Sequence, residues 1–261
     1  MELINRKYKI INKIGMGNFG QVFKGYNNRT KEEVAIKISS LENESSFLLK
    51  NESIYYNYLK DCDNIPILKW FGKDEQNYYL VLELYDESLS DIIKSIDSMR
   101  ENKFFFDIAK QLFLIIKSIH DKGLIHRDIK PDNFLFNRKK KKFVIIDFGF
   151  CVSYLTNKSH NLCVDVSSFL GSLDYASINC HNLKSQSRRD DLESICYVIF
   201  YLILGYLPWS GKSADEILKM KENFITICKI PQLISLWINI NQLKFNENPK
   251  YFLYNEILNN Y

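Results

Sequence analysis

The chain has 261 residues, of which 46% are hydrophobic and 25% charged, a balance that excludes a disordered or fibrous chain. The 35 Lys and Arg residues outnumber the 31 Asp and Glu residues by only four, too few to argue by charge alone for nucleic-acid or membrane binding. The length fits one chain folded into two lobes.

The N-terminal part, residues 1–84, is predicted to be a small antiparallel sheet with one helix. Met1–Lys9 has no apolar core, so we expect no secretory signal. Residues 44–60 are helical by composition. Short β-rich segments between Gly-rich or polar turns predict strands at Tyr8–Ile14, Gln21–Tyr26, Val34–Ser39, Ile67–Gly72 and Tyr78–Glu83.

The C-terminal part, residues 85–261, is predicted to be mainly helical. Apolar residues recur at three- and four-residue spacing between Phe105 and Ile119, which indicates a helix with one buried face. The apolar run Ile195–Trp209 predicts a buried helix, because it is shorter than the roughly 18 to 20 residues that span a bilayer. No linker-like run separates the two parts, so we expect two lobes in contact that enclose a nucleotide cleft.

The cysteines and the basic residues bear on the cellular compartment and the partners of the protein. The six cysteines show neither a C-x-x-C pair nor metal-finger spacing, so we expect reduced thiols and no zinc site or disulfide. The basic run Arg138–Lys142 lies between the predicted strands Phe134–Phe136 and Phe143–Ile146, where it caps a solvated hairpin or forms a nuclear-targeting or anion-binding patch. We expect an intracellular monomer, in the cytoplasm, the nucleus or both, without nucleic-acid or membrane partners.

A glycine-rich segment joins the first two predicted strands. It contains Gly15, Gly17 and Gly20, and it lacks the strand-to-helix context that a dinucleotide fold requires. A hairpin that covers phosphates fits better, because glycine has no Cβ to keep the backbone from a ligand. Taken alone, the motif is equally compatible with a plain glycine-rich hairpin.

On the next predicted strand, Lys37 directly follows the apolar residues Val34–Ile36. Glu52 follows on the predicted helix. An ion pair between them would hold the ammonium where it meets the α- and β-phosphates of ATP. Considered alone, each residue is more simply a solvated surface charge, and the surrounding motifs favour the ion pair.

The segment His126–Asn133 reads HRDIKPDN, the pattern of a protein-kinase catalytic loop. The glycine-rich segment, Lys37 and Glu52 precede this loop in the order expected of a protein kinase. Together with the loop, they make the chain resemble the protein kinases. The resemblance implies that Asp128 accepts or orients the proton of the attacking hydroxyl, and that Lys130 neutralises charge on the γ-phosphate. A lysine at this position is similar to serine/threonine kinases rather than tyrosine kinases.

Two hard oxygen ligands complete the predicted chemistry. Asn133 ends the catalytic loop, and Asp147 begins the segment Asp147–Gly149, which reads DFG. Carboxylate and amide oxygens suit Mg²⁺, which would bridge the oxygens of the transferred phosphate.

Within the protein kinases, the chain resembles the casein kinase I family. The likeness extends from about Tyr8 to about Phe252 and includes PDNFL from Pro131, YASIN from Tyr175, SRRDDLES from Ser187 and LPW from Leu207. The segment Ser-Ile-Asn, where most kinases carry Ala-Pro-Glu, is a mark of that family. The resemblance implies a bilobal α+β kinase fold over residues 1–261, ATP and Mg²⁺ as cofactors, and Ser/Thr hydroxyls of proteins as acceptors.

The resemblance also assigns roles to further residues. It makes Leu82 the gatekeeper, places Glu83 and Leu84 at the hinge that meets adenine, and makes Asp91 a ribose contact. Ser172 would support the catalytic loop, and Asp191 would hold the backbone of His126 and Arg127, since a buried carboxylate needs hydrogen-bonding partners. The remaining nucleotide contacts that it implies are Ile14, Gly15, Gly17, Gly20, Val22, Ala35, Lys37 and Glu52.

The chain departs from the family in places that bear on substrates and regulation. Asp86 and Glu87 replace small and proline residues at the hinge exit, and Cys196 replaces a glycine in the central helix. Asp174 stands where the family has an arginine, and the region between Trp209 and Trp237 is shorter and lacks a basic segment. Substrate docking is therefore less defined by the resemblance than catalysis.

Two other functions remain open at this point. A pseudokinase that acts as a scaffold would share the fold, although Lys37, Asp128 and Asp147 favour an active enzyme. A small-molecule kinase would pair a related aspartate with a loop that lacks the Arg-Asp-x-Lys-Pro arrangement found here.

Overall fold

The computed structural model describes residues 3–17, 20–43, 46–95 and 102–259. The tip of the glycine-rich segment and the first two positions of the predicted helix 44–60 therefore lie outside the described residues. The chain divides into two compact units. Unit 1 comprises Met1–Asp86 and Leu135–Cys151, and unit 2 comprises Glu87–Phe134 and Val152–Tyr261.

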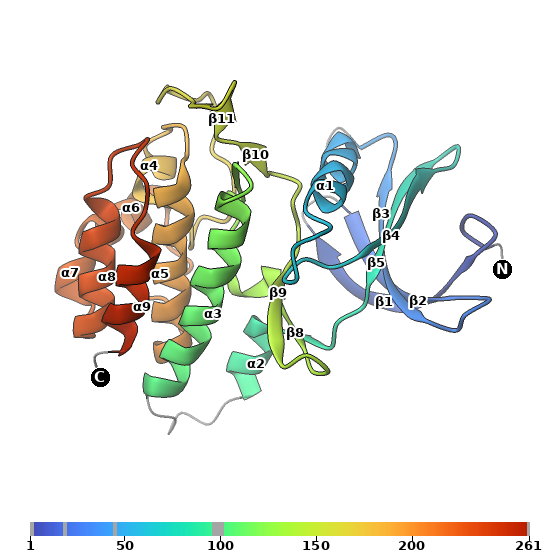
Figure 1. Ribbon diagram of the computed structural model, residues 1–261, viewed down its shortest axis with the longest axis horizontal. Helices are drawn as coiled ribbons and strands as arrows, with labels where there is room; N and C mark the ends of the chain where they lie inside the picture. Colours follow the sequence, from blue (N-terminus) through green and yellow to red (C-terminus); the bar gives the residue numbers. More distant parts are fainter. Residues whose placement is uncertain (1–2, 18–19, 44–45, 96–101, 260–261) are drawn as a thin grey trace. The chain divides into compact units, whose positions relative to one another are not determined.

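Unit 1 is built on a five-stranded antiparallel sheet with the strand order β1-β2-β3-β5-β4 (Figure 1). Helix α1 (Ser46–Tyr58) packs against β3, β4 and β5. The predicted sheet and its single helix are confirmed, with ends shifted by a few residues. The strands are β1 (Tyr8–Gly17), β2 (Gly20–Asn27), β3 (Glu33–Ser40), β4 (Leu68–Lys73) and β5 (Asn77–Glu83).

One face of this sheet carries a compact hydrophobic cluster. Alternation along the strands places every second side chain on that face. The cluster consists of Tyr8, Val34, Ile36, Tyr79 and Val81. The side chains between these positions, including Ala35 and Lys37 on β3, consequently point to the opposite face.

Unit 2 is mainly helical, as predicted. The long helices α3 (Asn102–His120) and α5 (Arg188–Leu204) pack against each other, and α9 (Tyr251–Asn259) lies along α3 (Figure 1). The other helices are α2 (Leu89–Ser95), α4 (Ile178–His181), α6 (Ala214–Glu222), α7 (Phe224–Ile227) and α8 (Pro231–Asn241). Within the part of the chain that the structure describes, no helix is long and apolar enough to cross a membrane.

The two predicted apolar helices have different outcomes. The stripe between Phe105 and Ile119 is the buried face of α3, as expected. The run Ile195–Trp209 is helical only as far as Leu204, because Gly205 adopts a left-handed conformation (φ 77°) that ends α5. Trp209 nevertheless remains fully buried beyond the helix.

Short elements connect the helices and carry the catalytic segments. Strands β8 (Phe134–Asn137) and β9 (Lys142–Ile145) form the predicted hairpin, and residues 138–142 at its tip are exposed. The remaining elements are β6 (Glu87–Ser88), β7 (Leu124–Ile125), the 3₁₀ helix η1 (Pro131–Asn133), β10 (Val152–Ser153), β11 (Leu155–Thr156) and β12 (Ser159–His160).

Candidate active site

Lys37 is the centre of a buried charge cluster in unit 1. Its Nζ lies 2.8 Å from Oε2 of Glu52 and 3.1 Å from Oδ1 of Asp147. Burial alone would lower the pKa of Lys37, but the attraction of Asp147 and Glu52 outweighs burial and raises it. Burial raises the pKa of Glu52 to about 7 despite the facing ammonium. With two carboxylates beside it, the ammonium of Lys37 stays protonated, and the predicted Lys37–Glu52 pair is confirmed.

Helix α1 also holds the segment Asp147–Gly149. Asn51 donates its side-chain amide to the carbonyl oxygen of Gly149 at 2.9 Å, and the Tyr56 hydroxyl accepts from the backbone N–H of Asp147 at 3.3 Å. The ring of Phe148 meets Tyr56 edge-on at 5.1 Å between centroids. Sequence reasoning missed Asn51 and Tyr56, although Tyr56 follows Glu52 by one helical turn and therefore shares its face.

The predicted nucleotide contacts on the sheet share one face. Val22 pairs directly with Lys37 and with Gly15, and Ala35 pairs with Leu82. Residues opposite each other on neighbouring antiparallel strands point to the same side. The sequence pattern thus places these contacts on the face that carries the ammonium.

The glycine-rich hairpin lies against that ammonium. A Cβ added to Gly17 would lie 3.4 Å from Cε of Lys37, and one added to Gly20 would lie 2.0 Å from the carbonyl oxygen of Ile38. At Gly20 a side chain is therefore excluded by backbone. Ile14, another predicted contact, is half exposed.

The predicted hinge follows β5. Leu82 is 8% exposed at the end of the strand, and Leu84 is half-buried beyond it. The carboxylate of Glu83 accepts a hydrogen bond from the Tyr85 hydroxyl at 2.8 Å. This bond occupies one oxygen of the Glu83 carboxylate.

The catalytic loop in unit 2 is organised around Asp128, which is 2% exposed. One carboxylate oxygen accepts from Lys130 Nζ at 2.7 Å, and the other accepts from the Ser172 hydroxyl at 2.8 Å. Lys130 also reaches Ser172 Oγ at 3.2 Å. The predicted support of the loop by Ser172 is thereby confirmed.

Asn133 is oriented by the same loop. Its side-chain amide donates to the carbonyl oxygen of Asp128 at 2.8 Å, which turns Oδ1 away from that carbonyl. Oδ1 of Asn133 in unit 2 and the carboxylate of Asp147 in unit 1 are donors of the type that Mg²⁺ takes. The described residues contain no group of three or more His, Cys, Asp and Glu side chains that could hold a metal by themselves. Each of the two donors, taken by itself, is of a kind that fits Mg²⁺, which is usually bound through one or two protein groups together with substrate phosphates.

Asp191, at the start of α5, anchors the catalytic loop as predicted. Its carboxylate accepts the backbone N–H of His126 at 2.7 Å and that of Arg127 at 2.9 Å. Arg127 has a φ of 69°, a left-handed conformation that persists only where its surroundings hold it. Gly171 passes so close that a Cβ there would lie 2.7 Å from the carbonyl oxygen of Arg127.

Asp91, the predicted ribose contact, is exposed at the start of α2. Its carboxylate accepts from both the hydroxyl and the backbone N–H of Ser88, at 2.6 and 3.1 Å, and the hydroxyl in particular lowers its pKa. The ionised carboxylate is thus fixed in direction.

The segment Ser177-Ile178-Asn179 is fastened to α5 by side chains. The Ser177 hydroxyl and the Asn179 amide both donate to Asp190 Oδ1, at 2.7 and 3.0 Å. The backbone N–H of Ile178 donates to Glu193 at 2.9 Å. The serine and the asparagine that replace Ala and Glu of Ala-Pro-Glu therefore have specific partners in this chain.

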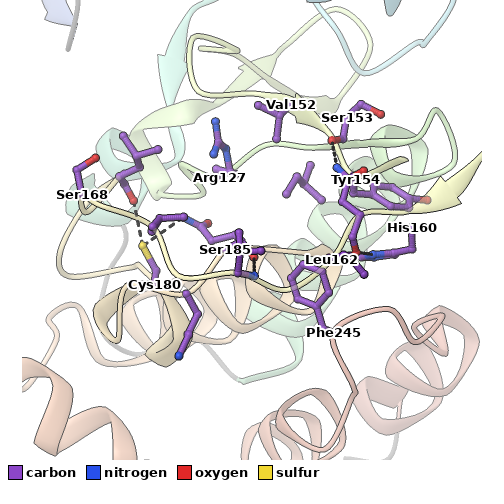
Figure 2. A pocket seen from close by; sticks show the side chains of 17 residues that line it. Arg127, Val152, Ser153, Tyr154, His160, Leu162, Ser168, Cys180, Ser185 and Phe245 are labelled. Atoms are coloured by element: carbon purple, nitrogen blue, oxygen red, sulfur yellow. Dashed lines mark hydrogen bonds between the residues drawn. The ribbon is translucent and has the colours of Figure 1, made fainter. Parts of the chain in front are cut away.

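A pocket of about 230 Å³ lies beside the catalytic loop, within unit 2 (Figure 2). Arg127 lines it together with aliphatic side chains that include Val152, Leu162, Val164 and Val166. Sequence reasoning did not predict this pocket, because its lining comes from β7, β10, the following loops and Phe245.

The comparison with protein families agrees with this arrangement. The family model described as the protein kinase domain matches residues 8–256. The predicted fold class, an α+β kinase fold with an antiparallel N-terminal sheet and a helical C-terminal part, is confirmed. With a match over nearly its whole length, and with the catalytic-loop and DFG segments held as described, this chain belongs to the protein kinase family.

Proposed function

We propose that this protein kinase is a serine/threonine kinase of the casein kinase I type. Protein kinases transfer a phosphoryl group to protein substrates and in general use ATP with Mg²⁺. The observation that carries the proposal is the placement of Asp128, whose carboxylate is held between the Lys130 ammonium and the Ser172 hydroxyl. A base fixed in this way is ready to orient a substrate hydroxyl.

Lys130 supports the preference for serine and threonine. Two residues after the base, its ammonium lies next to the carboxylate that meets the acceptor, so it would neutralise charge on the γ-phosphate during transfer. A well-placed general base contributes roughly 10²- to 10⁴-fold to the rate. In this proposal Asp128 and Lys130 are the catalytic residues.

Most of the proposed nucleotide contacts belong to unit 1. Lys37, fixed by Glu52, would meet the α- and β-phosphates, and Asp147 with Asn133 would hold Mg²⁺. Bound ATP with Mg²⁺ supplies the phosphoryl group and neutralises its charge. The adenine and ribose contacts would come from the hinge, from Asp91 and from the sheet face, namely Ile14, Gly15, Gly17, Gly20, Val22, Ala35, Leu82, Glu83 and Leu84.

The casein kinase I assignment is supported by the anchoring of Ser177 and Asn179 to Asp190. These contacts give the Ser-Ile-Asn segment a structural role in this chain. We also propose an intracellular monomer, in the cytoplasm or nucleus, without nucleic-acid or membrane partners. None of the six cysteines forms a disulfide within the part of the chain that the structure describes, in keeping with a reducing compartment.

The test is transfer of labelled γ-phosphate from ATP to serine, threonine and tyrosine peptides. Asp128→Asn should abolish transfer, and the wild-type enzyme should label serine and threonine peptides only. Asp132→Asn is the matched control, because Asp132 is an exposed carboxylate in the same loop. It should retain activity.

The alternatives predict different results. A pseudokinase scaffold would label no peptide, and a small-molecule kinase would label a metabolite without labelling protein. Labelling of tyrosine peptides would refute the proposed specificity and leave the protein-kinase activity in place.

A further inference from the structure

A hydrogen-bonded relay in unit 2 links the last helix to the catalytic loop. The hydroxyl of Tyr251, the first residue of α9, meets Nδ1 of His120 at the end of α3. Nε2 of the same ring lies 3.0 Å from Oδ2 of Asp191. That carboxylate holds the backbone N–H groups of His126 and Arg127. Tyr251 is therefore two side chains away from the peptide groups that precede Asp128.

The direction of each hydrogen bond in the relay follows from the charge states. Burial opposes ionisation of Asp191, but hydrogen bonds from His120 and His126 outweigh it and lower its pKa, so the carboxylate only accepts. Burial lowers the pKa of His120, so its ring is neutral. A neutral imidazole has one donor and one acceptor. Nε2 must therefore donate to Asp191, and Nδ1 must accept from Tyr251.

The main chain of His120 is fixed as well. Its carbonyl oxygen accepts a hydrogen bond from the Tyr154 hydroxyl at 2.9 Å, and Tyr154 stacks under the Arg188 guanidinium at 4.5 Å. Arg188 in turn donates to Asn248, just before α9, at 2.6 Å. The backbone of His120 is therefore restrained independently of Tyr251. Loss of the Tyr251 hydroxyl would change the tautomer and the orientation of the His120 ring and leave its backbone in place.

We propose that Tyr251 is a positioning residue for the catalytic loop, acting through the tautomer of His120 on Asp191. This inference rests on the proposed role of Asp128 as the catalytic base. The left-handed Arg127 lies directly between the anchored peptide groups and Asp128, so its conformation depends on Asp191. Tyr251 consequently affects turnover without touching ATP or the substrate.

Tyr251→Phe is the test variant, because it keeps the aromatic ring and its packing and removes only the hydroxyl. Tyr254→Phe is the matched control on the same helix. Tyr254 is 1% exposed, and its ring lies 6.1 Å from that of Tyr251, outside the relay. Steady-state kinetics, thermal unfolding and the nitrogen-15 shifts of the His120 ring are measured for both variants and the wild type.

The expected result is specific to Tyr251→Phe. Its kcat falls roughly three- to tenfold, as for loss of one neutral hydrogen bond, with KM for ATP unchanged. The Nδ1 shift of His120 moves, and Tyr254→Phe leaves kcat and the shift at the wild-type values. An unchanged kcat in Tyr251→Phe overturns the inference. An equal loss of kcat in both variants, in proportion to their loss of melting temperature, overturns it as well. A wild-type enzyme without kinase activity refutes the proposed function instead, and the His120 shifts still report whether the relay exists.

Discussion

Lys37 Nζ lies 2.8 Å from Glu52 Oε2, and the two residues are 7% and 1% exposed. Breaking a buried pair by removing one partner is costly, while the intact pair gives little net stability because both charges have left water. The main role of the pair is therefore to fix the position of the Lys37 ammonium. Its second carboxylate, Asp147, belongs to the segment proposed to bind Mg²⁺.

We predict that Lys37→Met folds and turns over about 100-fold more slowly, as for a misplaced reacting group. Methionine fills the space of the lysine stem, and Glu52, whose pKa is already raised to about 7, can take up a proton when the ammonium is lost. Circular dichroism and kcat are the measurements. Lys69→Met, which removes a surface ion pair with Glu32, is the control and should keep its activity. A wild-type kcat in Lys37→Met would refute the role of this residue.

Local patterns in the sequence predicted most of the elements that carry the site. Strand alternation placed Lys37 opposite the hydrophobic cluster, and the helical stripe of α3 was visible as a periodicity. The contacts of Asn51 and Tyr56 with the Asp147–Gly149 segment were not predictable in this way. They join residues more than 90 positions apart, and their formation depends on how α1 packs over the sheet.

Lys221 is a second residue whose surroundings could not be predicted from local sequence patterns. A lysine near the end of an amphipathic helix is expected to be solvated, yet Lys221 is 0% exposed. Its ammonium donates to the carbonyl oxygens of Leu173 and Ala176 at 2.8 and 2.6 Å and lies over the Tyr197 ring. Burial lowers its pKa to about 7. The two carbonyl groups belong to a loop 45 to 48 residues earlier in the chain, and no pattern local to α6 indicates them.

The second prediction concerns acid stability. Burial, and next the charge of Lys221, lowers the pKa of His181 from 6.5 to about 4. Below pH 6.5 the unfolded chain therefore binds a proton that the folded chain does not bind until about pH 4, so this contribution to stability is lost as the pH falls. The unfolding free energy of the wild type, relative to that of His181→Gln, should therefore drop by roughly 1 to 2 kcal/mol between pH 7 and pH 4. This is less than the whole shift of the His181 pKa would give, because solvent screens a ring that is only partly buried.

Urea unfolding of both proteins at several pH values measures this difference. Subtracting the variant removes the contributions of the other groups that titrate in this range, including the buried Glu52 and Glu193. Above pH 7 the difference should be constant. A difference that stays flat from pH 7 to pH 4 would show that His181 is not held neutral by the fold.

The third prediction is activity without phosphorylation of the segment Phe150–Leu170. Kinases that depend on such phosphorylation order this segment by pairing the phosphate with arginine. Here main-chain bonds already hold it, since Val166 N–H donates to Leu183 and Ser185 N–H donates to Val164, both at 2.8 Å.

Phosphatase treatment followed by a peptide assay checks this expectation. Activity should be unchanged, and alanine at the candidate positions should have no effect on kcat. These positions are Ser153, Thr156, Ser159, Ser167 and Ser168. Loss of most activity after phosphatase treatment, restored by incubation with ATP, would contradict the prediction.

The last prediction concerns substrates that already carry a phosphate upstream of the target. Casein kinase I enzymes, which this chain resembles, obtain a preference for them partly from basic residues near the activation segment. Asp174 stands in place of one such arginine. Its carboxylate accepts from the Ser210 hydroxyl at 2.8 Å, and its carbonyl oxygen accepts from the Trp209 indole at 2.9 Å, so the negative charge is held in place.

The cations that could compensate for the missing arginine have other partners. Lys184 pairs with Asp165, Arg188 donates to Asn248 and to main-chain carbonyls of residues 246 and 247, and Arg189 donates to the carbonyl oxygen of Leu243. These contacts favour structural roles for both arginines over compensation for the missing charge at position 174.

We therefore predict that the enzyme has lost or weakened the preference for primed substrates. At about 4 Å a pair of unit charges interacts by about 1 kcal/mol in water and about 4 kcal/mol at an effective dielectric of 20, so exchanging arginine for aspartate turns attraction for a phosphate into repulsion. The measurement is kcat/KM for paired peptides that differ only in an upstream phosphoserine. The two peptides should be used equally well, or the unprimed one better, whereas Asp174→Arg should gain a preference for the primed peptide. A many-fold advantage of the primed peptide in the wild-type enzyme would show that Asp174 does not control this selectivity.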